Sequence, residues 1–538
     1  MFGLMMQTPL LITGIMRHAD RVNGKTEVVS VTAENPRHRC TLGDVFRRAR
    51  KLANALARAG VQRGDRIGTI AWNDHRHLEL YYAVSCIGAI LHTVNPRLYP
   101  DQLTYIINHA GDRMLFADLT LVPLVERLKP SLTTVERVIV LSNDSYEAFI
   151  SDEPDTFDWP ELDERTASAL CYTSGTTGHP KGVLFDHRST VLHSYGSALV
   201  DTMGFGRADT VLAVVPMFHA NAWGLPYSAP MVGAKLVFPG PKMGDGETLA
   251  ALINEEKVTL AAGVPTVWQQ LLAYTREHDI GLESLEQVLV GGSACPLSIM
   301  NEFRDRHGVW TIHAWGMTEM SPLGSTNSKP LGYEQMSAAE QDSFRSRPGR
   351  PPFGVEMKIV DDAGRELPWD GKSSGMLKVR GPWVCSDYFN LNEKSAAHDE
   401  DGWFATGDVA NLREDGTVQI TDRAKDVIKS GGEWISSIDL ECVAAGHPKL
   451  LQAAVIGVPH PKWDERPLLI AVPRPGESPT REELLGWLDG RVAKWWIPDD
   501  VVFVEKIPLT ATGKISKLEL RQQFKDYRFG TGPQVRGS

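Results

Sequence analysis

An alternation between amphipathic helical segments and short apolar strands constrains the fold of this chain more than any other feature. Residues 42–60 read LGDVFRRARKLANALARAG, with apolar residues three to four positions apart and a glycine at the end. This spacing predicts an amphipathic helix. The apolar run DRIGTIAW follows at residues 65–72, a second helix-then-strand unit occupies residues 77–94, and similar units recur within residues 259–294. Because such strands are typical of buried parallel sheets, we predict an α/β fold.

The sequence pattern changes at about residue 349. The segments VEMKIVDD, GMLKVRGPW and GTVQITDR alternate in polarity and are punctuated by glycine and aspartate. They predict antiparallel strands that form a small barrel or sheet. Further along the chain, the sequence predicts a separate α/β module with strands at residues 453–459 and 468–474 and a helix over residues 481–495.

The charge distribution also separates the two ends of the chain. Residues 426–538 carry 15 basic and 15 acidic residues. The whole excess of negative charge therefore lies in the first 425 residues. Together with the length of 538 residues, which is ample for more than one core, this predicts two domains, residues 1–424 and residues 425–538.

Composition excludes several classes of protein. The formal net charge of -11 argues against a general nucleic-acid binder, which needs a basic surface. No apolar run reaches the roughly 18 residues of a membrane span, and the first residues lack the basic leader of a signal peptide. The six cysteines form no C-x-x-C pair, so we interpret them as reduced thiols. These features predict a cytoplasmic enzyme without nucleic-acid or integral membrane contact.

A glycine-rich segment, YTSGTTGHPKGV at residues 172–183, indicates an anion site. Backbone N–H groups in such a turn, together with hydroxyl side chains and a lysine, suit phosphate groups. The segment is not a P-loop, because Pro180 and the order of Lys181 and Gly182 break the required spacing. Taken alone, it could also be a surface turn.

This segment resembles the phosphate loop of the adenylate-forming superfamily, which contains acyl-CoA synthetases, adenylation domains and luciferases. Five further segments agree with that family in order: GGSA at 291–294, WGMTE at 315–319, TGD at 406–408, DRAKDVIKSGGE at 422–433 and TATGKI at 510–515. The segments MFHANAWGLPY and SGGEWISSIDLE are more narrowly similar to medium- and long-chain fatty acyl-CoA synthetases and to 3-(methylthio)propionate–CoA ligases.

The resemblance implies a large N-terminal domain of two helix-flanked sheets plus a small β-barrel, followed by a smaller, mobile α/β C-terminal domain. It also implies two reactions. In the first, the carboxylate attacks the α-phosphate of ATP and expels pyrophosphate. In the second, the thiol of coenzyme A attacks the acyl-adenylate and releases AMP. The first step needs positioning and charge stabilisation rather than a catalytic triad, because the substrate is the nucleophile.

Several residues acquire a role in nucleotide binding from this resemblance. Thr176 is expected near the α-phosphate and, with Glu319, at a Mg²⁺ ion, which prefers oxygen ligands. Asp408 is expected to bind both ribose hydroxyls, and Trp315 to lie against the adenine. The residues implied to contact the nucleotide or coenzyme A are Thr173, Ser174, Gly175, Thr176, Thr177, Gly178, Lys181, Gly292, Ser293, Ala294, His313, Ala314, Trp315, Gly316, Met317, Thr318, Asp408, Ile420, Arg423, Lys425, Gly431, Gly432, Glu433 and Trp434.

An apolar pocket for the acid is implied as well. His219 and Trp223 stand four residues apart, which would place them on one face of a helix. By the resemblance, His219 lies near the carboxylate and Trp223 walls the acyl tunnel, although a pair buried in the core would show the same spacing. The other residues expected at the pocket are Gly224, Val264, Pro265, Trp268, Gly292 and Met317.

Lys514 is expected to act in the first reaction only. In the family, the C-terminal domain turns about a hinge that matches Lys425, so that the lysine is replaced by a thioester-forming face. The catalytic set implied is therefore Lys514, His219, Glu319 and Thr176. Gly431 to Trp434 would serve the coenzyme A channel or the nucleotide.

The sequence leaves the substrate and several alternatives open. We favour a short- to medium-chain acid, 3-(methylthio)propionate included, over a long-chain fatty acid. A ligase that loads a separate carrier protein, or a luciferase-like oxygenase, would share the first reaction. A non-catalytic nucleotide-binding relative would be expected to lack Lys514, Glu319 or Asp408, and all three are present. The apolar residues 1–16 predict a homodimer, or packing on their own domain.

Overall fold

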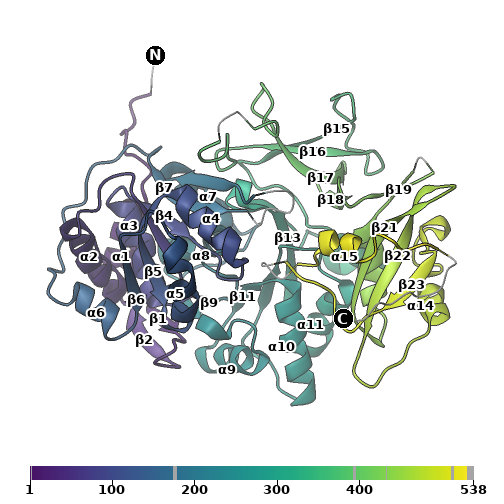
Figure 1. The fold of residues 1–538 in the computed structure, drawn as a ribbon, viewed down its shortest axis with the longest axis horizontal. Coiled ribbons are helices and arrows are strands. Elements are labelled where there is room, and N and C mark those ends of the chain that lie inside the picture. Colours follow the sequence, from purple (N-terminus) through teal and green to yellow (C-terminus); the bar gives the residue numbers. More distant parts are fainter. Residues whose placement is uncertain (2, 174–178, 392–394, 432, 511–513, 530–538) are drawn as a thin grey trace.

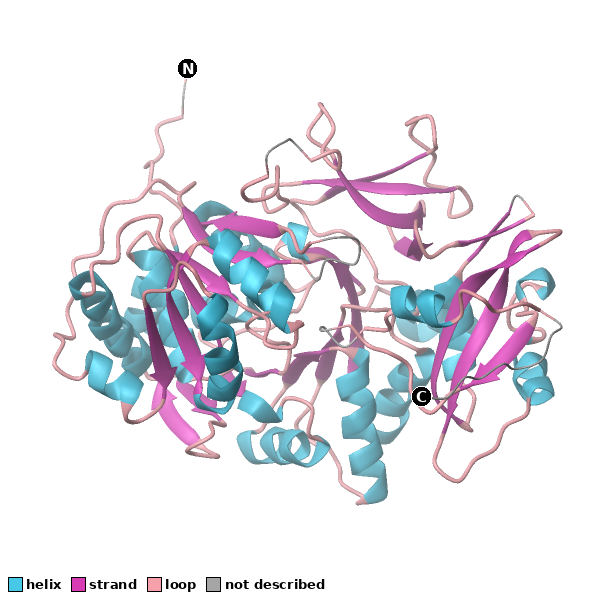
Figure 2. Ribbon diagram, viewed as in Figure 1, coloured by secondary structure: helices cyan, strands magenta, loops and turns pink. Residues whose placement is uncertain are grey.

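The fold is described by a computed structural model, which covers residues 1, 3–173, 179–391, 395–431, 433–510 and 514–529. Within these residues the chain forms four β-sheets, and helices cover the two large ones (Figures 1 and 2). The α/β fold predicted from the alternating segments is confirmed. In Figure 1 the large sheets lie to the left and centre, and the C-terminal sheet stands apart on the right.

The first sheet ends in the two strands that flank the glycine-rich segment. Its strand order is β6-β5-β3-β4-β7-β8, and all neighbours are parallel except β7 and β8. The glycine-rich segment connects this antiparallel pair. The strands are β3 (Arg66–Ile70), β4 (Ile90–Thr93), β5 (Asp112–Asp118), β6 (Arg137–Leu141), β7 (Ala167–Tyr172) and β8 (Gly182–Asp186).

The second sheet carries the next two motifs at the ends of adjacent strands. Its order is β14-β13-β12-β11-β9-β10-β1-β2, with antiparallel pairs only at the two edges. Ligands of parallel sheets bind beyond the carboxyl ends of the strands, where GGSA follows β12 and WGMTE ends β13. The strands are β1 (Glu27–Ser30), β2 (His38–Thr41), β9 (Thr210–Ala213), β10 (Lys235–Phe238), β11 (Leu260–Gly263), β12 (Gln287–Val290), β13 (Trp310–Gly316) and β14 (Leu323–Thr326).

The helices around these sheets follow the predicted apolar spacing. The predicted helix at residues 42–60 is α2, which begins with a capping box between Thr41 and Asp44 and buries Val45, Leu52 and Leu56. The helices of this part are α1 (Ile12–Asn23), α2 (Leu42–Arg58), α3 (His75–Cys86), α4 (Pro100–Ala110), α5 (Val122–Leu128), α6 (Ser145–Ile150), α7 (His187–Ala198), α8 (Leu225–Val232), α9 (Gly246–Glu256), α10 (Pro265–Glu277), α11 (Leu297–His307) and α12 (Ala338–Arg345).

The third sheet corrects one expectation. Its strands are antiparallel, as predicted, in the order β15-β16-β17-β18. No pairing between β15 and β18 closes it in the described residues, so it is an open sheet and not a small barrel. Four strands are too few to wrap around a filled interior. The strands are β15 (Glu356–Val360), β16 (Ser374–Arg380), β17 (Phe404–Leu412) and β18 (Val418–Arg423).

The C-terminal part has its own sheet and its own apolar clusters, which lie within residues 428–529. The predicted helix over residues 481–495 is too long, because α14 ends at Leu488, Asp489 is extended and Gly490 has a φ of 72°. The elements are β19 (Ile428–Ser430), β20 (Glu433–Ile435), β21 (Leu450–His460), β22 (Asp464–Pro473), β23 (Asp500–Phe503), α13 (Ser437–Ala445), α14 (Arg481–Leu488) and α15 (Lys517–Gln523). The boundary at residue 425 stays a prediction.

Two further observations concern membrane-spanning helices and the state of the cysteines. In the part that the structure describes, no helix has both the length and the apolar character needed to cross a membrane. All six cysteines lie in that part, and each is a free thiol.

Candidate active site

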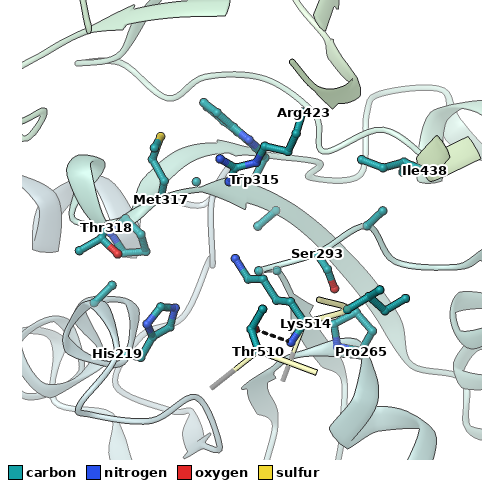
Figure 3. A pocket seen from close by; sticks show the side chains of 18 of the residues that line it. His219, Pro265, Ser293, Trp315, Met317, Thr318, Arg423, Ile438, Thr510 and Lys514 are labelled. Atoms are coloured by element: carbon teal, nitrogen blue, oxygen red, sulfur yellow. Dashed lines mark hydrogen bonds between the residues drawn. The ribbon is translucent and has the colours of Figure 1, made fainter. Parts of the chain in front are cut away.

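A central cavity collects most of the residues predicted to bind ligands (Figure 3). Its volume is about 500 Å³, and it shares lining residues, Lys514 among them, with a neighbouring cavity of about 630 Å³. Predicted residues that line the first are Thr173, Lys181, His219, Trp223, Pro265, Gly291, Gly292, Ser293, Ala294, Ala314, Trp315, Gly316, Met317, Thr318, Glu319, Arg423, Lys425 and Lys514. The second adds His313, Asp408 and Ile420.

Some predicted residues lie elsewhere or outside the description. Ser174, Gly175, Thr176, Thr177, Gly178 and Gly432 are outside the described residues, as is the side chain of Glu433. Gly431 and Trp434 belong to the hairpin of β19 and β20 and line neither cavity. The backbone N–H of Gly431 donates to the carbonyl of Trp463 at 2.8 Å, which ties the hairpin to the turn between β21 and β22.

Of the pocket residues predicted at α10, Pro265 lines the first cavity, whereas Val264 and Trp268 line neither cavity. Val264, at the start of the helix, lies behind Gly292, where a Cβ atom would be 3.3 Å from Val264 Cγ1. Trp268, by contrast, is fully buried and packs edge-on against Phe303 with ring centroids 6.0 Å apart. Trp268 is therefore part of the core between α10 and α11 and does not contact the cavity, because it lies on the helix face turned toward α11.

Lys514 extends from the C-terminal part into the first cavity. Figure 3 shows its side chain between Ser293 and Trp315, facing Arg423. The turn is closed by a hydrogen bond from the Lys514 N–H to Thr510 Oγ1 at 3.2 Å. Burial, reinforced by the charge of Arg423, lowers the pKa of Lys514 to about 8, while Asp408 and Glu319 oppose the shift. An ammonium group is therefore available at neutral pH where its charge is poorly hydrated.

Each carboxylate oxygen of Asp408 contacts a residue from another of the predicted motifs. Arg423, its cross-strand partner on β18, places Nε 2.7 Å from Oδ1, and the indole N–H of Trp315 donates to Oδ2 at 2.9 Å. Burial raises the pKa of Asp408, and both donors oppose that shift. Each carboxylate oxygen retains a lone pair, which suits a ligand with two adjacent hydroxyl groups.

Glu319 has a neighbour that the sequence did not single out. Tyr388 donates its hydroxyl hydrogen bond to Glu319 Oε1 at 2.8 Å. Glu319 is nearly buried, with 7% of its surface exposed. One carboxylate at the edge of the cavity fits Mg²⁺, which often takes one or two carboxylates and completes its shell with phosphate and water. No periodic pattern marks Tyr388, because its contact with Glu319 spans 69 residues.

The two ends of the glycine-rich segment, Thr173 and Lys181, are hydrogen-bonded to each other. The Thr173 N–H donates to the carbonyl of Lys181 at 2.9 Å, and the Lys181 N–H donates to Thr173 Oγ1 at 3.2 Å. These bonds continue the pairing of β7 with β8 and keep Lys181 at the cavity wall.

The spacing of His219 and Trp223 predicted that they share one face of a helix, and this prediction is wrong. The segment η3 (Ala220–Gly224) contains Asn221, Ala222 and Trp223 at φ values of 53°, 48° and 56°, which is left-handed backbone. The turn still brings both side chains to the cavity. Trp223 lies against Gly291, where a Cβ would be 3.2 Å from Trp223 Cη2. Burial, with Lys514 and Arg97, lowers the pKa of His219 to about 3, so its ring is neutral.

Sequence and structure comparisons place this geometry among known proteins. The chain is 54% identical over 542 residues to the 3-methylmercaptopropionyl-CoA ligase of Ruegeria pomeroyi, covering 98% of this chain and all of that protein. It is 50% identical to the medium-chain-fatty-acid–CoA ligase of Ectopseudomonas oleovorans, with 98% of both covered. A crystal structure of the anthranilate CoA ligase AuaEII with anthranoyl-AMP superimposes with a TM-score of 0.86 at 26% identity, covering 96% of this chain and 98% of that one.

The family assignment rests on two matched regions. Residues 15–389 match the AMP-binding enzyme family, and residues 439–514 match the AMP-binding enzyme C-terminal domain. The first region ends shortly after Tyr388 and contains the glycine-rich segment and Glu319, and the second ends at Lys514. With these matches and the cavity that unites their residues, the chain belongs to the AMP-binding enzyme family.

Proposed function

We propose that this protein is an AMP-forming carboxylate–CoA ligase that activates a short- or medium-chain acid, with 3-(methylthio)propionate as the leading candidate. The observation that carries the proposal is the convergence of Lys514, Glu319 and the Asp408–Arg423 pair on adjoining cavities. The names of the two relatives described above support the substrate class. Long-chain fatty acids, and a carrier protein in place of coenzyme A, are the alternatives.

The first reaction is a displacement at the α-phosphorus of ATP. A carboxylate oxygen of the acid forms the new P–O bond, and the bond to pyrophosphate breaks. The ribose hydroxyls would bind the free lone pairs of Asp408, and the adenine would lie on Trp315. Glu319 and Thr176 would hold Mg²⁺, which lowers the charge of the phosphates when it is bound. Lys514 would stabilise the charge that gathers on the α-phosphate oxygens.

The second reaction replaces AMP by the thiol of coenzyme A. The sulfur attacks the acyl carbon, the thiol proton passes to water, and the C–O bond to the phosphate breaks, which releases AMP. We propose that the C-terminal domain, residues 425–538, turns about Lys425 between the two reactions and withdraws Lys514. The apolar clusters confined to residues 428–529 support a unit that can move as one body.

The acid would lie beside His219 with its chain directed toward Trp223. A neutral His219 can approach a carboxylate without adding a second charge to that of Lys514. The ring of Trp223 closes the wall next to Gly291. A wall at this place favours a short apolar chain, because a longer one has to displace the ring.

The reaction type is tested by product analysis. Incubation with ATP, Mg²⁺, coenzyme A and an acid should yield AMP, pyrophosphate and a thioester in equal amounts, measured by chromatography. In a panel from acetate and 3-(methylthio)propionate to palmitate, kcat/KM should peak among short and medium chains. ADP and phosphate as products would refute the ligase chemistry. A kcat/KM that climbs steadily to sixteen carbons would refute the substrate class alone.

The role of Lys514 is tested by separating the two reactions. Lys514→Ala should fold normally and slow acyl-adenylate formation by about 10²–10³, the cost of losing one such donor. Supplied with presynthesised acyl-adenylate and coenzyme A, the variant should make thioester at nearly the parent rate. Equal impairment of both reactions would contradict the proposed domain movement.

The charge of Lys514 should also determine how the rate of adenylation depends on pH. Its pKa is lowered to about 8, so the ammonium is complete below that pH and is lost above it. Adenylation by the parent should therefore fall as the pH rises through 8. Lys514→Arg keeps its charge, so whatever activity that variant retains should lack the alkaline fall.

The role of Trp223 is tested against a matched tryptophan. Trp223→Ala should admit longer acids and slow the best short one. Trp268→Ala removes a buried ring that does not line the cavity, so it should cost about 3–5 kcal/mol of stability and leave the chain-length profile unchanged. Thermal melting and kcat/KM across the panel separate the two. A Trp223→Ala variant that melts early with an unchanged profile would show that Trp223 is only core.

We also propose a homodimer that forms through the first residues of the chain. Leu4 and Met6 are 99% and 92% exposed, whereas Ile12 and Met16 are buried in the chain's own core. Sedimentation velocity at micromolar concentration should therefore give a species of twice the 59.4 kDa chain mass. Leu4→Asp combined with Met6→Asp should give the monomer. A parent that sediments as a monomer would rule out the dimer.

A further inference from the structure

Tyr388 lies between two opposite charges of the active site. Its hydroxyl donates to Glu319 Oε1 at 2.8 Å, and the ammonium of Lys181 is 4.8 Å from the centroid of its ring. The ring therefore meets the cation with its electron-rich face, at a distance typical of a cation–π contact. The hydroxyl meets the carboxylate with its proton. All three side chains line the first cavity.

The hydroxyl of Tyr388 can only act as a donor toward Glu319. An ionised carboxylate carries no hydrogen and can only accept, so the phenol supplies the proton of the 2.8 Å bond to Glu319 Oε1. A proton donated to a carboxylate makes a charge-assisted bond, which is stronger and more directional than a neutral one.

The segment that carries Tyr388 is fastened to both sides of the cavity. The N–H of Cys385 donates to the carbonyl of Glu319 at 2.8 Å, and the N–H of Phe389 donates to the carbonyl of Gly182, next to Lys181, also at 2.8 Å. The backbone therefore fixes the position of residue 388 relative to each charged partner. This placement does not depend on the side chain of Tyr388 itself.

The nature of the two partners explains why a spacer matters. An ammonium and a carboxylate that pair directly satisfy each other and offer less to a polyanion and its cation. With the ring of Tyr388 between them, Lys181 keeps its charge for phosphate oxygens and Glu319 keeps an oxygen for a metal. Outer partners of metal-binding carboxylates fix their orientation, and losing one typically costs about 10–100-fold in metal affinity.

We propose that Tyr388 is a positioning residue that separates Lys181 from Glu319 and orients both toward the magnesium–triphosphate group. The inference rests on the proposed function, because it assigns the two partners to the phosphates and the metal of ATP. It adds a residue to the site, and it gives the hydroxyl and the ring of that residue separate tasks.

Two variants separate those tasks. Tyr388→Phe removes only the hydroxyl, so it should leave ATP affinity in EDTA within about twofold of the parent and raise the Mg²⁺ concentration that half-saturates the ATP complex by about tenfold. Tyr388→Leu also removes the ring, so it should weaken ATP binding in EDTA as well. Isothermal titration calorimetry with ATP and Mg²⁺, without acid or coenzyme A, measures both quantities.

The control is the neighbouring residue on the same segment. Phe389→Leu alters an apolar contact but keeps the backbone bond to Gly182, so both affinities should match the parent. A Tyr388→Phe variant with a parental Mg²⁺ requirement, whether or not its melting temperature falls, would overturn the proposal. So would a Phe389→Leu variant with the same Mg²⁺ defect.

The test is independent of the ligase chemistry. A parent that binds ATP but forms no AMP with any acid would count against the proposed function, and the calorimetric comparison would still decide the role of Tyr388. A parent that does not bind ATP would overturn both.

Discussion

The proposed active site depends on holding an ammonium group in a place where water screens it poorly. Lys514 is partly buried, and its pKa is lowered to about 8 by burial and by Arg423. It remains a cation at neutral pH because Asp408 and Glu319 act against that shift. These carboxylates come from β17 of the third sheet and from the turn after β13 of the second, and the lysine comes from the C-terminal part. The charged cluster around Lys514 therefore forms only where the second sheet, the third sheet and the C-terminal part meet at one cavity.

The sequence predicted the parts of this site that are local. A parallel strand followed by a polar turn has a recognisable pattern, and GGSA and WGMTE occur where β12 and β13 end. The α/β fold was predictable for the same reason, because the apolar period of α2 and the apolar run of β3 express burial that each segment undergoes on its own. Ordered motifs then related Asp408 and Lys514 to one nucleotide, although 106 residues separate them in the numbering.

The features that depend on packing between distant segments were predicted incorrectly or missed. Trp268 has the apolar character of a pocket residue, and only the position of α11 decides that it lies in the core. A local error is the helix predicted over residues 481–495, which ends at Leu488 because Asp489 is extended and Gly490 is left-handed. Tyr388 could not be found from local pattern, since the residue with which it bonds lies 69 positions away.

The turn beside Trp223 shows how the core can determine the shape of the proposed substrate wall. Left-handed backbone costs L-residues roughly 1–2 kcal/mol each, and Asn221, Ala222 and Trp223 adopt it in succession. Such a turn persists only where its surroundings hold it. Tyr81 donates to Asn221 Oδ1 at 3.2 Å and also to the carbonyl of Met217.

The Tyr81 hydroxyl extends from α3, a helix that is buried along its whole length. Asn73, just before the same helix, accepts the N–H of Met217 at 2.6 Å and donates to the carbonyls of Ala213 and Val215. The chain before His219 is thus bonded to the start of α3 on one side and to Tyr81 on the other. The position of the Trp223 ring therefore follows from residues more than 130 positions earlier, which do not line either cavity. If Trp223 walls the acyl pocket as proposed, a substitution at Asn73 or Tyr81 should alter acyl selectivity, because it releases the strained turn that holds the ring.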